Sequence, residues 1–368
     1  MTVEVRNVLP KDAIPSVEEP TFAPVPDRPG ALLDDDEVIV VEQSAGNRTA
    51  ENVEHGTARA YPVRYLHFHE IVNDVLDSGV PIAVTWCPLC GSAVVYDRRL
   101  DDGRVLEFGV SGKLADDDLV MYDRETDSEW KQSLGVAIAG PLSGAELSVL
   151  PAATTTVDAF VRRYPEGLLM EPPGGASEAA SDDDEPAPID YDDAPYEAYF
   201  EGDGFGLAAH RGTGGRDWDR EDVDPKTVVL GLEHDGEALG VPLPVVDRAD
   251  GVVTTTVGGL DIVVFATEDG IHAFEDPGCD WRRVPGGFRA GEDTGAGPIY
   301  DGATGAPVEE LAERPGEKPV EEHGEETAVH PDGVGNAERL RRVPARRLFA
   351  FAWQDDHGPD AFLLDPGG

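Results

Sequence analysis

The stretch Ile82-Ala-Val-Thr-Trp-Cys-Pro-Leu-Cys-Gly-Ser-Ala-Val-Val-Tyr96 decides the local fold. Two runs rich in β-branched and aromatic residues flank a connection in which proline fixes φ and Gly91 allows a positive φ. The pattern therefore predicts strand, tight turn, strand. A turn of this kind directs the sulfurs of Cys87 and Cys90 to the same side, so the predicted hairpin carries a two-thiol knuckle.

The rest of the chain repeats the same style of short apolar runs between turn residues. Glycine occurs 42 times and proline 30 times in 368 residues. Two helices are predicted, over residues 65–76 and over residues 156–164 after a threonine-rich cap. The fold class expected is mainly β with a few short helices (α+β). The clearest strand candidates are residues 38–41, 82–86, 93–96, 228–232 and 262–266.

Four short patterns recur in the same order and indicate an internal duplication of a β-rich unit. The alternative is that β-proteins rich in glycine and proline produce such echoes by chance. The shared offset places Thr267 opposite Cys87, Gly270 opposite Cys90 and Ala249 opposite His69. The first half would then be the functional one. The matched segments, with their offsets in residues, are 56–62 and 236–242 (236 − 56 = 180), 82–84 and 262–264 (180), 122–126 and 300–304 (178), and 147–151 and 340–344 (193).

Amino-acid composition along the chain predicts where its folded units and its insertions lie. Segments rich in Gly, Ala, Ser, Asp, Glu and Pro cannot bury enough apolar area to fold alone. The acidic segments 172–194 and 309–336 are of this kind, and we expect neither to touch the site. The predicted parts are an N-terminal extension (1–35), a first β-rich unit (36–171), an acidic insertion and connection (172–225), and a second β-rich unit (226–368) that contains the insertion 309–336.

The charge of the chain limits the classes of partner. The formal net charge is −45, from 29 basic and 74 acidic residues, and the acidic runs are spread along the whole chain. A uniformly acidic surface indicates adaptation to high salt, where self-repulsion is screened; ordinary acidic solubility is the alternative. Phosphate binding needs basic patches, so nucleic acid and anionic membranes are not expected partners. No membrane-length apolar run or leader is seen, so a soluble, cytoplasmic protein is expected.

The knuckle resembles half of a zinc ribbon, but a second Cys pair is missing. The predicted helix 65–76 would place His69 on an otherwise apolar, inward face, where it could be a third ligand or an ordinary hydrogen-bonded core residue. Met121 could be a fourth ligand or a gap-filling core side chain. Two thiolates, an imidazole and a thioether form a soft set that suits copper, whereas zinc would accept Cys87, Cys90 and His69 with water.

The sequence therefore supports three functions. The first is a copper- or zinc-binding protein, for which a protein or metal-delivery partner is the expected partner. The second is a thiol–disulfide redox protein that uses Cys87 and Cys90, although the strand after the knuckle argues against a thioredoxin-like fold. The third is a structural or interaction module without chemistry. No phosphate loop, dinucleotide fingerprint or nucleophile elbow points to another reaction.

Six short motifs follow one another in order: Ala58-Arg-Ala-Tyr-Pro62, His69-Glu-Ile-Val-Asn-Asp74, Cys87-Pro-Leu-Cys-Gly91, Phe108-Gly-Val-Ser-Gly112, Asp118-Leu-Val-Met-Tyr-Asp123, and Trp130 with Gln132. Together they resemble the signature of the domain-of-unknown-function 3179 family, over roughly Val17 to Phe362. That family has no settled activity, so the resemblance implies kinship and candidate positions at His69, Cys87, Cys90 and Met121, but no reaction. Family members often carry an export leader, which this chain does not show.

Overall fold

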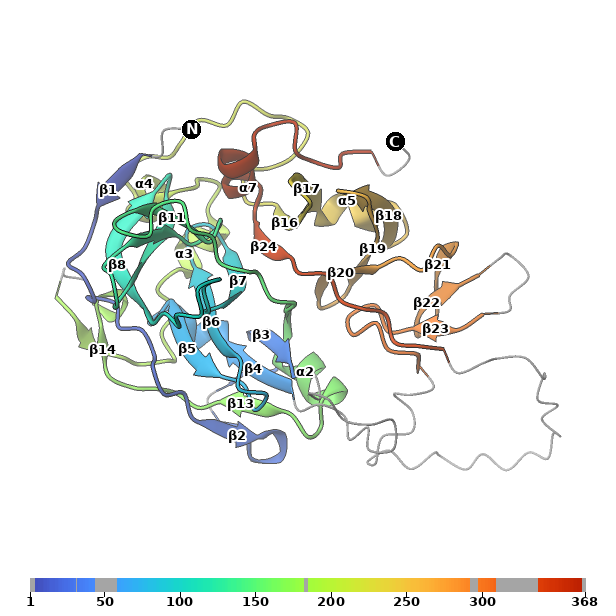
Figure 1. The fold of residues 1–368 in the computed structure, drawn as a ribbon, viewed down its shortest axis with the longest axis horizontal. Coiled ribbons are helices and arrows are strands. Elements are labelled where there is room, and N and C mark those ends of the chain that lie inside the picture. Colours follow the sequence, from blue (N-terminus) through green and yellow to red (C-terminus); the bar gives the residue numbers. More distant parts are fainter. Residues whose placement is uncertain are drawn as a thin grey trace.

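The computed structural model describes residues 4–30, 32–43, 58–181, 185–291, 297–308 and 337–365. Strands dominate and the helices are short, which confirms the predicted fold class (Figure 1). All five of the clearest strand candidates lie within strands. Among the described residues, no helix combines the length and apolar character needed to cross a membrane.

Two five-stranded sheets belong to the first part of the chain. One has the order β1-β8-β9-β10-β11 and the other the order β12-β3-β4-β13-β2. The first sheet comprises β1 (Val5–Asn7), β8 (Phe108–Ala115), β9 (Asp118–Asp123), β10 (Glu129–Lys131) and β11 (Val136–Ala139). The second comprises β12 (Ala153–Thr156), β3 (Glu37–Glu42), β4 (Ala58–Pro62), β13 (Leu168–Met170) and β2 (Phe22–Pro24).

A six-stranded sheet joins the two predicted units, with the order β17-β16-β24-β7-β6-β5. Strand β24, from the end of the chain, lies between β16 of the second unit and β7 of the first, where Arg347 pairs with Ala93 (Figure 1). The two halves therefore share one sheet. Its strands are β5 (Ile71–Val75), β6 (Pro81–Cys87), β7 (Ser92–Asp97), β16 (Val228–His234), β17 (Glu237–Pro242) and β24 (Arg346–Phe349).

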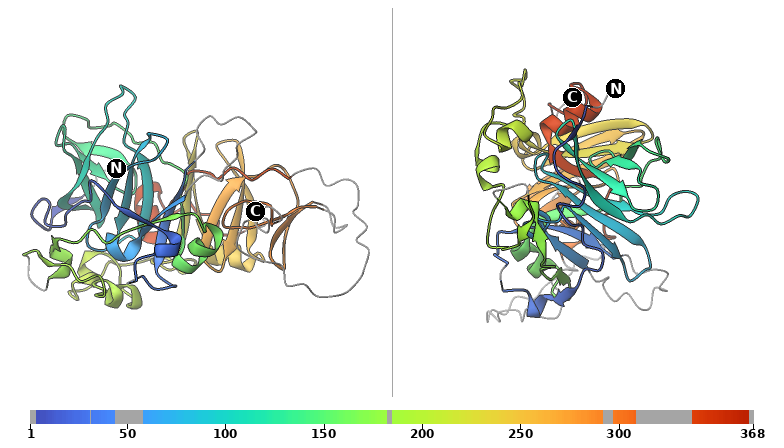
Figure 2. Two further views of the ribbon diagram at one scale, coloured as in Figure 1. Left: turned by 90° about the horizontal axis from the view of Figure 1, so that it is seen from below. Right: turned by 90° about the vertical axis from the view of Figure 1, so that its left-hand side faces the viewer.

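Smaller sheets and short helices complete the described structure, and the longer axis of the molecule runs from the first unit to the second (Figure 2). The sheets are β18 (Val252–Val257), β19 (Leu260–Thr267) and β20 (Gly270–Glu275); β21 (Trp281–Val284), β22 (Gly287–Ala290) and β23 (Ile299–Tyr300); and β14 (Ala176–Ser177) with β15 (Ala187–Pro188). The helices are η1 (Val25–Asp27), α1 (Val63–Leu66), α2 (Val157–Arg163), η2 (Glu178–Ala180), α3 (Glu197–Glu201), α4 (Leu207–His210), α5 (Leu243–Arg248) and α7 (Ala350–His357).

The helix predicted over 156–164 is confirmed, and Thr156 caps α2 by accepting a hydrogen bond from the backbone N–H of Ala159. The helix predicted over 65–76 is wrong, because α1 ends at Leu66 and β5 begins at Ile71. The sequence Ile-Val-Asn-Asp-Val is rich in β-branched residues, and it pairs along its whole length with β6. Sheet pairing with a neighbouring strand thus outweighs a helical spacing of apolar residues.

The same order of elements occurs twice. The first is β3-β4-α1-β5-β6-β7 and the second is β16-β17-α5-β18-β19-β20. The opening hairpins agree in register, since Val38 pairs with Pro62 in the first. Val229 pairs with Pro242 in the second, and 242 − 62 = 180. Gly56, at the start of the first sequence echo, lies outside the described residues.

Each unit closes with one more strand and helix, β12–α2 in the first and β24–α7 in the second. Ala153 of β12 pairs with Val40 of β3. Arg346 of β24 pairs with Gly231 of β16, and 346 − 153 = 193, the offset of the last sequence echo. The closing strands also reach across, because β24 contacts β7 and β12 contacts β20.

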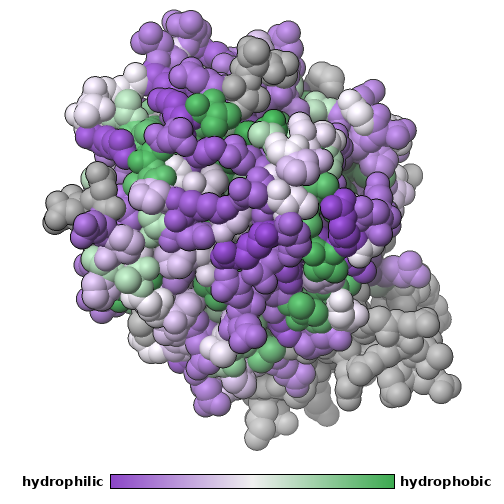
Figure 3. All heavy atoms as spheres, turned by 60° about the vertical axis from the view of Figure 1, so that its left-hand side comes forward, coloured by the Kyte–Doolittle hydropathy of each residue, from purple (hydrophilic) through white to green (hydrophobic). Residues whose placement is uncertain are grey.

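The apolar side chains form several buried clusters, one of which surrounds the knuckle. It contains Cys87 and Cys90 together with the indole rings of Trp130 and Trp353. The surface over the first unit is mostly hydrophilic, with hydrophobic residues in small separate groups (Figure 3). The knuckle is therefore part of the interior of the protein and not of its acidic surface.

Candidate metal centre

The knuckle is the turn between β6 and β7, as the sequence predicts. Cys87 pairs with Ser92, and the backbone N–H of Gly91 donates to the carbonyl oxygen of Pro88 at 3.3 Å. Gly91 has φ +53°, and a Cβ at this position would lie 2.7 Å from ring carbons of Phe349. Both the left-handed backbone and the ring packed against it require glycine here.

The two thiols meet a carboxylate from a different hairpin. One ligand atom each from Cys87, Cys90 and Asp118 lie within 4.8 Å of one another, and this is the one such group of three or more His, Cys, Asp or Glu side chains in the described structure. Asp118 is the first residue of β9, and all three side chains are buried. The Cys90 thiol also donates to the carbonyl oxygen of Asp117 at 3.4 Å.

Sequence reasoning missed Asp118. It lies in residues 116–118, one of the acidic runs from which an acidic surface is predicted, yet Asp117 is 2% exposed and Asp118 is 1% exposed. A signal was available, since Asp118 opens the motif Asp118-Leu-Val-Met-Tyr-Asp123 that also contains the predicted ligand Met121.

Asp118 has one satisfied and one unsatisfied oxygen. Its Oδ2 accepts a hydrogen bond from the backbone N–H of Ser133 at 2.8 Å, whereas Oδ1 has no hydrogen-bond partner among the described residues. Burial raises the pKa of Asp118 to about 6, and the nearby Lys131 ammonium opposes that rise. A buried carboxylate oxygen without a partner is costly, so this atom is suited to bind a cation.

Lys131, a cation beside the cluster, is itself held by carboxylates. Lys131 Nζ lies 2.7 Å from Asp356 Oδ1 on α7 and 3.2 Å from Asp116 Oδ2. Burial raises the pKa of both thiols, and Asp118 adds to the rise at Cys87 and at Cys90. Without a metal, both thiols are therefore protonated at neutral pH.

His69 lies elsewhere. It is buried as predicted, but its Nδ1 lies 2.9 Å from the carbonyl oxygen of Pro15 and its Nε2 lies 2.7 Å from the Tyr191 hydroxyl. The carbonyl can only accept, so Nδ1 donates and Nε2 accepts from the phenol. With both ring nitrogens occupied, His69 is outside the group formed by Cys87, Cys90 and Asp118.

Met121 is fully buried in the apolar cluster that contains both cysteines. It lies three residues after Asp118 on β9, and side chains an odd number of residues apart on a strand point to opposite faces. Ligation by Met121 stays a prediction, and the gap-filling role remains its alternative.

The first acidic insertion contacts the predicted site residue His69 and reaches the cavity beside Cys87, so the expectation that it avoids the site is wrong. Tyr191 binds His69, and Glu178 and Cys87 line the same cavity. Just beyond the insertion, the Tyr199 hydroxyl donates to the carbonyl oxygen of Leu89 at 2.6 Å. Insertion 309–336 lies outside the described residues.

The matching turn of the second unit is shorter. Thr267 pairs with Gly270, which leaves two residues in the turn, whereas four residues separate Cys87 from Ser92. Thr267 therefore matches Cys87, but Gly270 matches Ser92, and the expected alignment of Gly270 with Cys90 is wrong.

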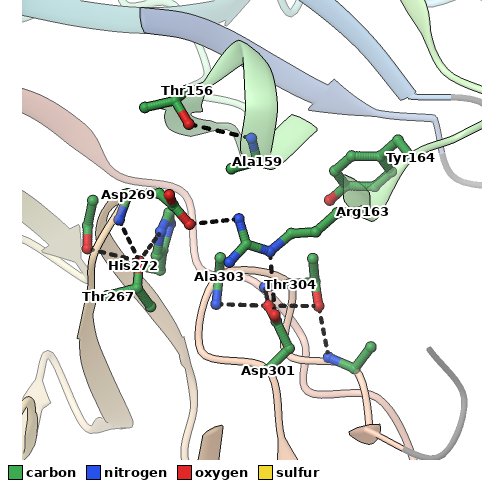
Figure 4. A network of polar contacts seen from close by, with 12 residues as sticks. Thr156, Ala159, Arg163, Tyr164, Thr267, Asp269, His272, Asp301, Ala303 and Thr304 are labelled. Atoms are coloured by element: carbon green, nitrogen blue, oxygen red, sulfur yellow. Dashed lines mark hydrogen bonds and ion pairs between the residues drawn. The ribbon is translucent and has the colours of Figure 1, made fainter. Parts of the chain in front are cut away.

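A polar network of a different kind occupies this second turn (Figure 4). Arg163 from α2 donates to Asp269 at 2.8 Å and to Asp301 at 3.2 Å. His272 Nε2 lies 3.4 Å from the Thr267 hydroxyl. Arginine–carboxylate pairs of this geometry join the first unit to the second and offer no soft ligand.

The class of protein is thus a β-rich fold of two similar units that share one sheet, with a dithiol–carboxylate cluster in the first unit. The chain belongs to the family described as "Protein of unknown function (DUF3179)", whose model matches residues 11–360. No curated protein and no solved structure matches the chain. The resemblance predicted from the motifs is confirmed at the level of the family.

Proposed function

We propose that this protein binds a divalent metal ion, zinc in preference to copper, through Cys87, Cys90 and Asp118. The observation that carries the proposal is the convergence of three buried ligand atoms within 4.8 Å. Two thiolates and one carboxylate oxygen are accepted zinc ligands, and a water or a small molecule can complete a tetrahedral site.

The unsatisfied oxygen of Asp118 supports this proposal. Its Oδ1 is buried without a hydrogen-bond partner among the described residues, and a metal ion would satisfy it. Metal binding by cysteine releases the thiol protons. Two displaced protons and one divalent cation carry the same charge, so the net charge of the buried group does not change.

The charge balance on metal binding also favours divalent zinc over monovalent copper. A Cu(I) ion that displaced both protons would leave one additional negative charge beside Asp118 and Asp356, and an uncompensated buried charge is strongly unfavourable. The carboxylate is also a harder ligand than the imidazole and thioether predicted from sequence.

The thiol–disulfide alternative receives less support from the surroundings of the thiols. Burial raises the pKa of Cys87 and Cys90, and a protonated, buried thiol is a poor nucleophile. A purely structural knuckle does not account for the unsatisfied oxygen of Asp118.

A cobalt titration tests the proposal. Anaerobically prepared, metal-free protein is titrated with Co²⁺, whose thiolate charge-transfer absorption reports cysteine ligation. We expect one equivalent to bind to the wild type and to a Cys279→Ser control, because Cys279 lies outside the cluster. The Cys87→Ser, Cys90→Ser double variant should show no such absorption. Wild-type protein without thiolate absorption would refute the proposal, and a reversible Cys87–Cys90 disulfide would favour the redox alternative.

We also propose that the two units arose by duplication. The repeated order of elements, the matched hairpin register and the reciprocal contacts of β12 and β24 support it. In this account the first unit gained a longer turn with two cysteines, whereas the second contributes β24 and α7, which cover the site.

A further inference from the structure

We propose that Glu70 is a transfer ligand, a carboxylate that binds the incoming metal ion on its way from solvent to the buried thiols. The inference rests on the proposed metal function and adds a route to it. No ligand role was assigned to Glu70 by the sequence motifs.

A route is needed because the site is enclosed. Cys87 is 1% exposed, Cys90 is 0% exposed and Asp118 is 1% exposed. A hydrated cation cannot reach these atoms unless the protein opens or a channel exists. Stripping water from a cation along such a channel is unfavourable unless oxygen ligands replace the lost water.

A cavity of about 100 Å³ supplies that channel on one side of the knuckle. It lies between the Cys87 turn, the β8–β9 hairpin and α4, and its lining includes exposed Arg211, half-buried Lys113 and Glu178, and buried Cys87. Cys90 and Asp118 are not part of the lining. Cys87 is therefore the first ligand of the cluster that an entering ion meets.

Glu70 is the buried carboxylate in this cavity. It is 8% exposed, and its carboxyl makes no hydrogen bond or ion pair with the described residues. Its surroundings otherwise resemble an apolar core, with Ile14, Val110 and Leu119 in the same lining. A carboxyl group left without a partner in such a place is available to a passing cation.

The backbone fixes where this carboxyl points. Glu70 has φ +57°, a left-handed conformation that residues other than glycine, asparagine and aspartate rarely adopt. Two hydrogen bonds hold it there: its N–H donates to Leu66 O and its carbonyl accepts from the N–H of Trp86, both at 2.8 Å. Trp86 directly precedes Cys87, so the Glu70 backbone is tied to the strand that carries the first thiol.

The cations of the cavity do not neutralise Glu70. Lys113 forms an ion pair with Glu129, and the His210 ring stacks on Tyr196 at a centroid distance of 4.9 Å. Burial, with repulsion from Glu178 and Asp118, raises the pKa of Glu70 to about 8, so an entering divalent ion would meet a carboxyl group without a cation partner and displace its proton before it reaches the thiols.

The test is the rate of metal loading. Metal-free full-length protein is mixed rapidly with Co²⁺ alone, and the thiolate absorption is followed in time; release is followed by adding excess chelator. In Glu70→Gln, we expect loading and release to slow together by about 10- to 100-fold, which corresponds to losing one hydrogen bond to a charged group. The dissociation constant and the final spectrum should not change.

Two variants serve as controls. Glu166→Gln makes the same substitution at an exposed position outside the cavity and should load at the wild-type rate. Glu70→Asp keeps a carboxylate, and aspartate tolerates the left-handed backbone better than glutamate, so it should retain most of the rate. Wild-type loading by Glu70→Gln would overturn this inference alone. A changed spectrum or a weaker affinity would also overturn it, because Glu70 would then be an equilibrium ligand. Absence of Co²⁺ binding to the wild type would instead refute the proposed function.

Discussion

Replacing Lys131 with methionine removes the cation that balances the carboxylates beneath the knuckle. The Lys131 side chain is 3% exposed and that of Asp356 is 2% exposed, with 2.7 Å between Nζ and Oδ1. Removing one partner of a pair this well buried leaves an uncompensated charge and typically lowers the free energy of unfolding by about 3–5 kcal/mol. Asp116 is 27% exposed at its side chain, so its contact with Lys131 adds little.

The expected loss for Lys131→Met is therefore about 3–5 kcal/mol in urea-induced unfolding of the metal-free protein. The double variant Lys131→Met, Asp356→Leu replaces the pair by apolar groups and should recover at least half of that loss. Asp118, which keeps its buried carboxyl in both variants, accounts for the remainder. A single-variant loss below about 1 kcal/mol, as for surface pairs, would refute the reasoning.

Three further predictions follow from the surroundings of the site. Burial lowers the pKa of His67 from 6.5 to about 4. Below pH 6.5 the unfolded chain therefore binds a proton that the folded protein does not bind, and the free energy of unfolding falls by up to about 3 kcal/mol. The free energy of unfolding, measured at a series of pH values, should fall less steeply toward acid pH in His67→Phe than in the wild type. An unchanged pH dependence would contradict this. Iodoacetamide should modify Cys87 before Cys90 in metal-free protein, by peptide mass spectrometry, because only Cys87 lines the cavity; the reverse order would show that another path exists. Asp118→Asn should weaken zinc binding by more than about 100-fold, a larger loss than expected for a residue that only hydrogen-bonds a ligand. His69→Gln should leave the zinc affinity within about tenfold of the wild-type value. Competition with a chromophoric chelator measures both, and equal losses would restore His69 as a ligand.

Local features of the fold could be predicted from sequence. The turn at residues 87–91 depends on proline and glycine next to β-branched runs, and the start of α2 depends on a threonine cap, so neighbours along the chain determine both. The strand at Ile71–Val75 depends instead on pairing with β6, and a helical spacing of apolar residues concealed it.

Of the candidate site, the part formed by neighbours along the chain could be predicted from sequence, and the part formed by tertiary packing could not. Cys87 and Cys90 are three residues apart and belong to one turn, whereas Asp118 comes from another hairpin and Asp356 from the last helix. An acidic run such as 116–118 is solvated in most proteins, and only tertiary packing buries it here. His69 was correctly predicted to be buried, but its hydrogen-bond partners, Pro15 and Tyr191, lie 54 and 122 residues away.

The most direct test of the account is the X-ray absorption spectrum of the protein loaded with one equivalent of zinc. A zinc ion bound by Cys87, Cys90 and Asp118 should give two sulfur scatterers at about 2.3 Å with oxygen scatterers at about 2.0–2.2 Å, and no imidazole multiple scattering. A shell with one sulfur or none, or a clear imidazole contribution, would contradict a site formed by Cys87, Cys90 and Asp118.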